Sequence, residues 1–366
     1  MRVLLPTPDY PPTSGGIQLL LERLVHHSRL SYEVVTLNVP RDRHLSMAPG
    51  VTRTPRLGDR RLAVGALNAI ALARAMASRP DAVLSGHVVT GPSALAIQGL
   101  LGVPAIQFLY AMELGERPSL TRLVTQRARA SLAISSHTQR EALALGAPAE
   151  CVHMILPGVD PPTGSSSLPV ERQTDPPTII TVARLEDRYK GFDVMIKALP
   201  LVRARVPDAR WVVVGEGSLR AELEAMAASL DVADRITFTG RLDDEARDEW
   251  LERADVFAMP SRLLPGGRGG EGFGIVYLEA GTHGLPCVAG DVGGSVDAVV
   301  DGETGLLVDP TDHVAVADAI ADLLLDPDMR KRLGEAGRAR AKKLSWAHMA
   351  EQVDDLIERV VAEAKR

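Results

Sequence analysis

The feature that most constrains the fold is an alternation of short apolar segments with longer segments of helical period. The short apolar runs predict buried strands, and the stretches between them repeat apolar residues at helical spacing. Strands that alternate with helices form βαβ units around a parallel sheet, so we expect an α/β protein. In the first half the predicted strands are Met1–Pro6, Tyr32–Leu37, Ala82–Leu84, Ala105–Leu109 and Ser131–Ile134.

The alternation stops at a segment rich in Pro, Ser and Gly and then starts again, which predicts two domains joined by a linker. We expect residues 1–160 and 178–344 to form two Rossmann-like, doubly wound domains, with 161–177 as the linker. The C-terminal helix at 345–366 is expected to pack back on the first domain. Such domains bind ligands outside the carboxyl ends of their strands, here in an interdomain cleft. The strands predicted after the linker are Thr178–Val182, Arg210–Val214, Ile236–Thr239, Val256–Met259, Pro286–Ala289 and Gly305–Val308.

Composition excludes several classes of protein. A chain of 366 residues can bury two cores, and 45% hydrophobic with 24% charged residues is typical of a soluble globular protein. No apolar run reaches the about 18 residues of a membrane span, and the N-terminal segment does not resemble a signal peptide. Cys151 and Cys287 lie far apart and outside any CxxC or CxxH spacing. That pattern argues against disulfides and zinc, so we expect a cytoplasmic protein.

The charge is distributed unevenly. The first 170 residues hold 16 arginines, no lysine and 11 acidic residues, whereas the remainder holds 25 basic and 36 acidic residues. A basic surface with apolar residues such as Leu120, Leu123 and Val124 could rest on an anionic membrane. Alternatively the arginines are solvated or pair with Glu113 and Glu116. Nucleic acid is not an expected partner. The arginines form two groups, Arg53, Arg56, Arg60 and Arg61, and Arg117, Arg122, Arg127 and Arg129.

The segment EGFGIVYLE, Glu271–Glu279, carries the richest chemical signal. It follows the Gly-rich loop Pro265–Gly270 and turns into a helical pattern after Gly274. A helix that begins after flexible glycines exposes backbone N–H groups and a positive dipole end, which suits a phosphate, although such a turn is more often a simple connection. Glu279 lies among apolar residues, and a buried carboxylate needs hydrogen-bond donors such as ribose hydroxyls.

The form EGFGIVYLEA resembles the Glu-x7-Glu signature of the retaining glycosyltransferases of family 4, which have the GT-B fold. The likeness covers nearly the whole chain in order and spacing. The insertion Leu263–Gly270 is similar to that of the phosphatidyl-myo-inositol mannosyltransferases. The other matching segments are Gly15-Gly16, Ser136-x-Thr138, Pro157–Asp160, Ala183–Leu185, Tyr189–Asp193, Val214–Gly217, Phe238–Leu242 and Ala254–Val256.

The resemblance implies a nucleotide-sugar donor site in the second domain. Arg184 and Lys190 would hold the donor diphosphate, because cations stabilise the charge that builds on the departing phosphate. Glu271 would accept hydrogen bonds from the sugar, and Glu279 from the ribose. The residues implied as catalytic are Glu271, Arg184, Lys190 and Tyr110. Those implied in donor binding are Gly16, Arg184, Lys190, Arg241, Leu242, Glu271, Phe273, Gly274, Ile275 and Glu279.

Two features of the sequence bear on the mechanism. No Asp-x-Asp follows a strand, and Asp326-Pro327-Asp328 lies in a polar turn, so we expect a reaction without a metal. Family members often carry a histidine after the fourth strand of the first domain, where this chain has Tyr110, or Met112 if the alignment shifts. His87, His137 and His283 receive no role, since a lone histidine is more often structural.

Several functions remain open at this point. The expected donor is GDP-mannose, and UDP-sugars are the second choice of donor. The expected acceptor is a hydroxyl group that is lipid-linked or belongs to a soluble small molecule. The resemblance implies same-face attack with retention of configuration. A lipid-linked acceptor would place the enzyme on the inner face of the cell membrane. The alternatives are a GT-B-fold sugar-nucleotide epimerase or hydrolase, and a non-catalytic nucleotide-sugar-binding domain.

Overall fold

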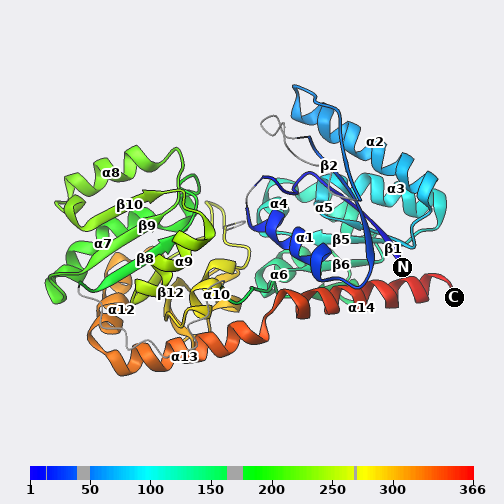
Figure 1. Ribbon diagram of the computed structural model, residues 1–366. Coiled ribbons are helices and arrows are strands. Elements are labelled where there is room, and N and C mark those ends of the chain that lie inside the picture. The colour runs from blue at the N-terminus through cyan, green and yellow to red at the C-terminus, as the bar shows by residue number, and fades with distance from the viewer. Residues whose placement is uncertain (14, 39–49, 163–175, 268–269) are drawn as a thin grey trace. The chain divides into compact units, whose positions relative to one another are not determined.

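The computed structural model describes residues 1–13, 15–38, 50–162, 176–267 and 270–366. These residues form two compact units (Figure 1). Unit 1 comprises Met1–Gly158 and Trp346–Arg366, and unit 2 comprises Val159–Ser345. Each unit is built on a parallel sheet, so the expected α/β class with two Rossmann-like folds is confirmed. Most of the predicted linker, and part of the Gly-rich insertion, lies outside the described residues, and the predicted domain boundaries stay predictions.

Unit 1 contains a seven-stranded sheet in the order β3-β2-β1-β4-β5-β6-β7. The sequence analysis missed its two edge strands, β3 and β7. Each has only three residues, and β3 has no fully buried residue, so neither leaves an apolar run to detect. The strands are β1 Arg2–Thr7, β2 Ser31–Thr36, β3 Val51–Arg53, β4 Ala82–Ser85, β5 Ala105–Leu109, β6 Ala130–Ala133 and β7 Val152–Met154.

Helices of unit 1 pack on this sheet through apolar faces. Leu4, Val35 and Val83 of the strands meet Leu67 and Ile97 of the helices in one core cluster. The helices are α1 Gly16–His27, α2 Arg60–Ser78, α3 Gly91–Leu101, α4 Ala111–Glu116, α5 Pro118–Thr125, α6 Ser136–Ala144 and α14 Trp346–Ala364, with 3₁₀ turns η1 Val88–Thr90 and η2 Ala149–Cys151. No helix in the described part of the chain is long and apolar enough to cross a membrane.

Unit 2 contains a six-stranded sheet in the order β10-β9-β8-β11-β12-β13. All six strands lie within a residue of their predicted positions, because most of them are short, largely apolar runs of the kind that parallel sheets bury. The strands are β8 Thr178–Val182, β9 Arg210–Val214, β10 Ile236–Gly240, β11 Val256–Met259, β12 Cys287–Gly290 and β13 Gly305–Val308.

The helices of unit 2 complete its core, in which Trp211 and Phe192 are fully buried beside Ile179 and Ile320. They are α7 Phe192–Arg205, α8 Arg220–Ser229, α9 Asp244–Arg253, α10 Ile275–Thr282, α11 Ser295–Ala298, α12 His313–Leu325 and α13 Pro327–Lys343, with 3₁₀ turns η3 Arg188–Lys190 and η4 Ala233–Arg235. The strand order reverses between β8 and β11, as it does between β1 and β4 in unit 1. Loops at such switch points are where open α/β sheets bind ligands.

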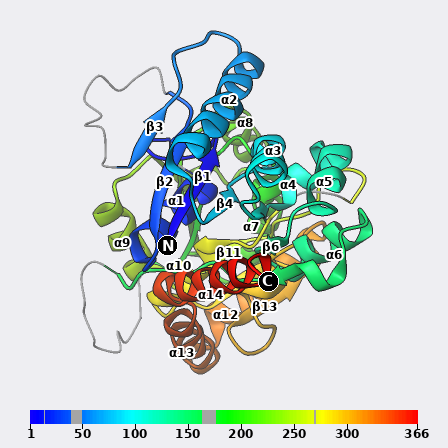
Figure 2. The same cartoon turned by 90° about the vertical axis from the view of Figure 1, so that its right-hand side faces the viewer.

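A buried carboxylate fastens helix α14 to unit 1. The helix lies beside α1 in both views (Figures 1 and 2). Asp354 is 1% exposed, and its carboxylate accepts hydrogen bonds from the Ser28 hydroxyl at 2.6 Å and from the Arg29 backbone N–H at 2.9 Å. The Arg29 guanidinium also pairs with Asp355 at 2.7 Å, but there both side chains are largely exposed. The buried carboxylate of Asp354 therefore ties α14 to the end of α1, in addition to the buried apolar face of the helix.

We expect Asp354→Ala to lower the free energy of unfolding of unit 1 by about 2–3 kcal/mol, because a buried N–H and a hydroxyl lose their acceptor. The neighbouring Asp355→Ala is the matched control and should change stability by less than about 1 kcal/mol, as is usual for an exposed ion pair. Urea unfolding followed by circular dichroism measures both values. Equal effects of the two substitutions would contradict this account of the helix.

Candidate active site

The site residues predicted in unit 2 lie on loops at the carboxyl ends of its strands. Arg184 and Lys190 lie on the connection after β8, and Glu271 lies on the connection from β11 to α10. Gly274 is the N-cap of α10. These connections belong to the two strands at which the sheet order reverses, so the fold brings them to one edge of the sheet.

Lys190 and Glu271 form a nearly buried ion pair. The Lys190 ammonium donates to the Glu271 carboxylate at 2.5 Å, and the two side chains are 13% and 10% exposed. Burial alone would lower the pKa of Lys190, but the adjacent Glu271 carboxylate outweighs it and holds that pKa well above its usual range. The ammonium also lies 5.1 Å from the centre of the Tyr189 ring. Lys190 is therefore a fixed cation, and within the described residues only Glu271 accepts from its ammonium, which leaves two of the three N–H donors for a ligand.

Arg184 is placed differently from Lys190. Its side chain is 60% exposed and pairs with Asp187 at 3.1 Å. Arg241 is also exposed, and Leu242 is half-buried at the end of the β10 connection. No contact within the described residues joins Arg184 or Arg241 to the pair of Lys190 and Glu271. The structure thus brings one of the two predicted cations into a built site and leaves the other on its rim.

The start of α10 has the backbone conformation that the glycines of EGFG imply. Gly274 has φ of 90°, and a Cβ there would approach the Tyr277 ring to 2.4 Å, so only glycine fits. Phe273 is 2% exposed and anchors the loop in the core. The Gly294 N–H donates to the Glu271 carbonyl at 2.8 Å, which fixes the loop from the other side. The N–H groups of Ile275 and the next residue are left at the positive end of the helix.

Glu279 lies one turn further along α10 and is partly buried. Burial raises its pKa, and Arg247 of α9 opposes that effect. Sequence reasoning did not single out Arg247, because the run DDEARDEW has the composition of a solvated helix. In the structure Arg247 donates to Asp244 at 3.0 Å and to Asp248 at 3.3 Å and acts on Glu279 by charge. A carboxylate beside this cation is suited to accept hydrogen bonds from hydroxyl groups.

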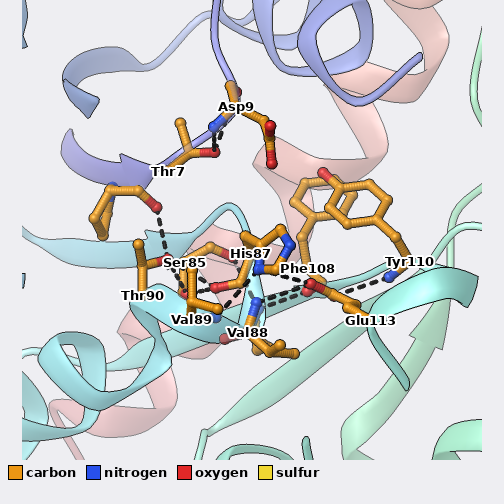
Figure 3. A network of polar contacts seen from close by, with 12 residues as sticks. Thr7, Asp9, Ser85, His87, Val88, Val89, Thr90, Phe108, Tyr110 and Glu113 are labelled. Carbon is orange, nitrogen blue, oxygen red and sulfur yellow. Dashed lines mark hydrogen bonds and ion pairs between the residues drawn. The ribbon is translucent and has the colours of Figure 1, made fainter. Parts of the chain in front are cut away.

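Two predicted residues lie in unit 1, and so does a polar network that the sequence analysis missed. Gly16 is exposed and is the first residue of α1. Tyr110 follows β5, is 4% exposed and stacks on Phe108 with ring centres 5.7 Å apart. Figure 3 shows it beside a buried network in which Glu113 contacts His87. A Glu three residues after the helix N-cap Tyr110, at helical N3, is the sequence signal that could have marked this network.

Within the described residues no group of three or more His, Cys, Asp or Glu side chains could hold a metal ion. The string Asp326-Pro327-Asp328 begins helix α13, where the Asp326 carboxylate caps the Met329 N–H at 2.9 Å. Asp326 therefore has a structural use.

Comparison with known proteins identifies the family. The protein-family model described as "Glycosyltransferase Family 4" matches residues 14–162. The model described as "Glycosyl transferases group 1" matches residues 168–340. A GDP-mannose-dependent alpha-(1-6)-phosphatidylinositol monomannoside mannosyltransferase of Mycolicibacterium smegmatis is 34% identical over 360 residues, which cover 92% of each chain.

Solved structures show the fold. Sucrose-phosphate synthase of Thermosynechococcus elongatus matches with a TM-score of 0.80 at 22% identity, over 99% of each chain. The Anabaena protein HepE, solved in complex with UDP, matches with a TM-score of 0.78 at 20% identity, over 98% of this chain and 99% of that one. The two matching family descriptions and the relative that is 34% identical over nearly the whole chain show that this protein belongs to the family 4 glycosyltransferases, with the GT-B fold.

Proposed function

We propose that the protein is a retaining, metal-independent mannosyltransferase that moves mannose from GDP-mannose to a hydroxyl of a phosphatidylinositol-type lipid. The relative from Mycolicibacterium smegmatis, which is named for GDP-mannose and a phosphatidylinositol acceptor, supports the donor and the acceptor class. The observation that carries the proposal is the nearly buried pair of Lys190 and Glu271 at the switch point of unit 2.

This pair suits the chemistry of glycosyl transfer. Lys190 would donate to the β-phosphate as the sugar leaves, and a preorganised cation stabilises the developing charge without reorganisation. Glu271 would hold Lys190 with one oxygen and accept sugar hydroxyls with the other. Arg184, which is exposed and has one weak partner in Asp187, would turn to the same phosphate when the donor binds.

The remaining donor contacts would involve both main-chain and side-chain groups. The N–H groups after Phe273 and Gly274, beginning with Ile275, would meet the diphosphate at the positive end of α10. Glu279 would accept the ribose hydroxyls. Arg241 and Leu242 would lie along the base through main-chain atoms. Gly16 would allow its backbone to approach the phosphate, since it has no side chain.

We infer that the reaction proceeds by same-face attack, in which the leaving phosphate accepts the proton of the acceptor hydroxyl. In this scheme Arg184 and Lys190 supply the positive charge that a divalent cation supplies elsewhere. We therefore expect full activity in excess EDTA. Loss of activity in EDTA that Mg²⁺ or Mn²⁺ restores would contradict the metal-independent mechanism.

The function is tested by offering the full-length protein GDP-mannose, UDP-glucose and UDP-galactose, each with phosphatidylinositol vesicles or with free myo-inositol. We expect release of GDP that depends on the lipid and a product whose anomeric configuration by NMR matches that of the donor. Release of GDP in the absence of an acceptor would indicate a hydrolase. Preference for UDP-sugars would overturn the donor assignment, and transfer to free inositol alone would overturn the lipid acceptor.

The structure changes which basic residues are candidates for a membrane surface. Arg53 is partly buried and donates to the backbone carbonyls of Leu37 and Pro11, so it belongs to the fold of unit 1. In the second group Val124 is 1% exposed and packs inward, whereas Leu123 is 39% exposed, so only part of the expected apolar face is on the surface. Two more exposed leucines lie beside arginines before and at the start of α2, and we call this surface the α2 patch. It consists of exposed Arg56, Leu57, Arg60, Arg61 and Leu62.

We propose that the α2 patch rests on anionic lipid. Leu57 and Leu62 are 43% and 65% exposed, and the three arginines beside them would each contribute about 1 kcal/mol near a charged surface. Arg60→Ala with Arg61→Ala should lower binding to phosphatidylglycerol vesicles on the order of tenfold or more at low salt. The matched control pairs Arg127→Ala with Arg129→Ala, which removes the same charge elsewhere on unit 1. Co-sedimentation measures both, and equal losses would leave only a non-specific charge effect.

A further inference from the structure

Two chain segments carry the buried pair of Lys190 and Glu271, and the backbone of Arg262 contacts both of them. Arg262 follows β11 on the connection that continues to Glu271. Its N–H donates to the carbonyl of Tyr189, the residue before Lys190, at 2.8 Å. Its carbonyl oxygen packs against Gly270, the residue before Glu271, where a Cβ would approach it to 2.7 Å. Arg262 is therefore in contact with a neighbour of each member of the ion pair.

The side chain of Arg262 fixes this backbone to helix α7. Its guanidinium donates to both oxygens of the Asp193 carboxylate, at 3.0 and 3.1 Å. A fork of two parallel hydrogen bonds sets the orientation of the two groups as well as their distance. Asp193 lies in the first turn of α7, where the positive end of the helix favours a carboxylate. The pair thus joins the loop after β11 to the start of the helix that follows Lys190.

Arg262 and Asp193 pair with each other and not with the charges around them. The two side chains are 26% and 37% exposed, so solvent screens them less than it screens a fully exposed pair. Within the described residues the Asp193 carboxylate accepts hydrogen bonds from Arg262 alone. The nearby Arg188 pairs with Glu222 instead, at 2.6 Å.

The same two connections also pack closely on the other side of Lys190. Gly191 has φ of 80° and lies against the Pro260 carbonyl, to which a Cβ would come within 2.3 Å. Packed backbones of this kind transmit a displacement instead of absorbing it. A shift of the loop after β11 would therefore reach Lys190 through both of its neighbours.

We propose that Arg262 and Asp193 are positioning residues for sugar transfer, which keep the Lys190 ammonium and the Glu271 carboxylate in register. They would act through that pair and not by contact with the donor. The inference rests on the proposed function, in which Lys190 meets the β-phosphate. A preorganised cation stabilises the developing charge only while it stays in place, and a misplacement of about 1 Å can cost about 10² in rate.

Nitrogen NMR of the lysine ammonium groups tests the positioning in the full-length protein, without donor or turnover. The Lys190 side chain is 13% exposed and its ammonium is held by Glu271, so its protons should exchange slowly with water. Every other lysine of the chain is exposed, and its ammonium protons should exchange too fast to give such a signal. Those lysines, all among the described residues, are Lys197, Lys331, Lys342, Lys343 and Lys365.

Arg262→Ala and Asp193→Asn should each speed the exchange of the Lys190 ammonium protons about tenfold, because the loops lose a charge-assisted pair of hydrogen bonds. Arg262→Lys keeps the charge but cannot form the fork, so its exchange rate should fall between those of Arg262→Ala and the wild type. Arg188→Ala breaks the exposed pair with Glu222 and is the matched control, which should leave the signal unchanged. Slow exchange that persists in both Arg262→Ala and Asp193→Asn would overturn the proposal.

Kinetics complete the test. Arg262→Ala and Asp193→Asn should each lower kcat about 10-fold to 100-fold, with a change of less than about threefold in the donor KM. The double variant should be no slower than Arg262→Ala, because both substitutions break the same pair. Losses that multiply in the double variant, or an effect confined to the donor KM, would overturn the positioning role. Wild-type protein that transfers no sugar would defeat the proposed function, and the ammonium signal would then decide by itself whether Arg262 holds Lys190.

Discussion

Lys190→Ala is expected to lower kcat by about 10²–10³, the scale seen when one preorganised charge-stabilising donor is lost. The ammonium is held by Glu271 at 2.5 Å in a nearly buried position, so its charge meets little screening by solvent. Because the donated hydrogen bond strengthens as the phosphate departs, the loss should appear in kcat and less in the donor KM. Steady-state kinetics with saturating acceptor measures this split.

The stability of Lys190 variants shows whether a loss of activity comes from catalysis or from folding. Removing Lys190 leaves the Glu271 carboxylate buried without its cation, which costs about 3–5 kcal/mol for a buried pair. The double variant Lys190→Ala/Glu271→Ala removes both charges, so it should unfold at a higher temperature than Lys190→Ala while remaining inactive. Arg188→Ala, which breaks an exposed pair with Glu222 in the same 3₁₀ turn, is the control and should keep wild-type kcat. A Lys190→Ala enzyme with unchanged kcat would remove this residue from the phosphate site.

Glu279→Ala is expected to raise the donor dissociation constant on the order of 10-fold to 100-fold, because the ribose loses a charged acceptor. Burial raises the pKa of Glu279, so bound ribose hydroxyls should lower it again by stabilising the carboxylate. Donor affinity is therefore expected to fall in acid as Glu279 takes up a proton. Titration calorimetry with GDP and GDP-mannose at several pH values measures both effects.

Glu271→Ala should behave differently from Glu279→Ala. Since Glu271 would fix the sugar and Lys190, its loss is expected to lower turnover by about 10²-fold with a smaller change in donor affinity. Glu249→Ala, which breaks an exposed i,i+4 pair with Arg253 on α9, is the matched control for both carboxylates. If both variants kept wild-type kinetics and affinity on the true donor, the roles proposed for the two glutamates would be wrong.

The sequence alone predicted the α/β class and the central strands of the two sheets, since the signal for a buried parallel strand is local. The six strands of unit 2 are short, largely apolar runs, and each lies within a residue of its predicted position. The glycines of EGFG likewise predicted the turn into α10, because φ of 90° at Gly274 is a property of its own backbone. The edge strands β3 and β7 escaped detection because partly exposed three-residue strands carry no such local signal.

Only the tertiary structure decided which charged groups meet. Lys190 and Glu271 are 81 residues apart, and nothing in the local pattern distinguishes their buried pair from the exposed pair of Arg184 and Asp187. The same holds in unit 1, where β4 and β5 bring His87 to Glu113 across 26 positions of the chain. Burial and pairing depend on contacts between segments that are distant in sequence, so the protonation and the orientation of a site emerge only when the sheet has assembled its loops.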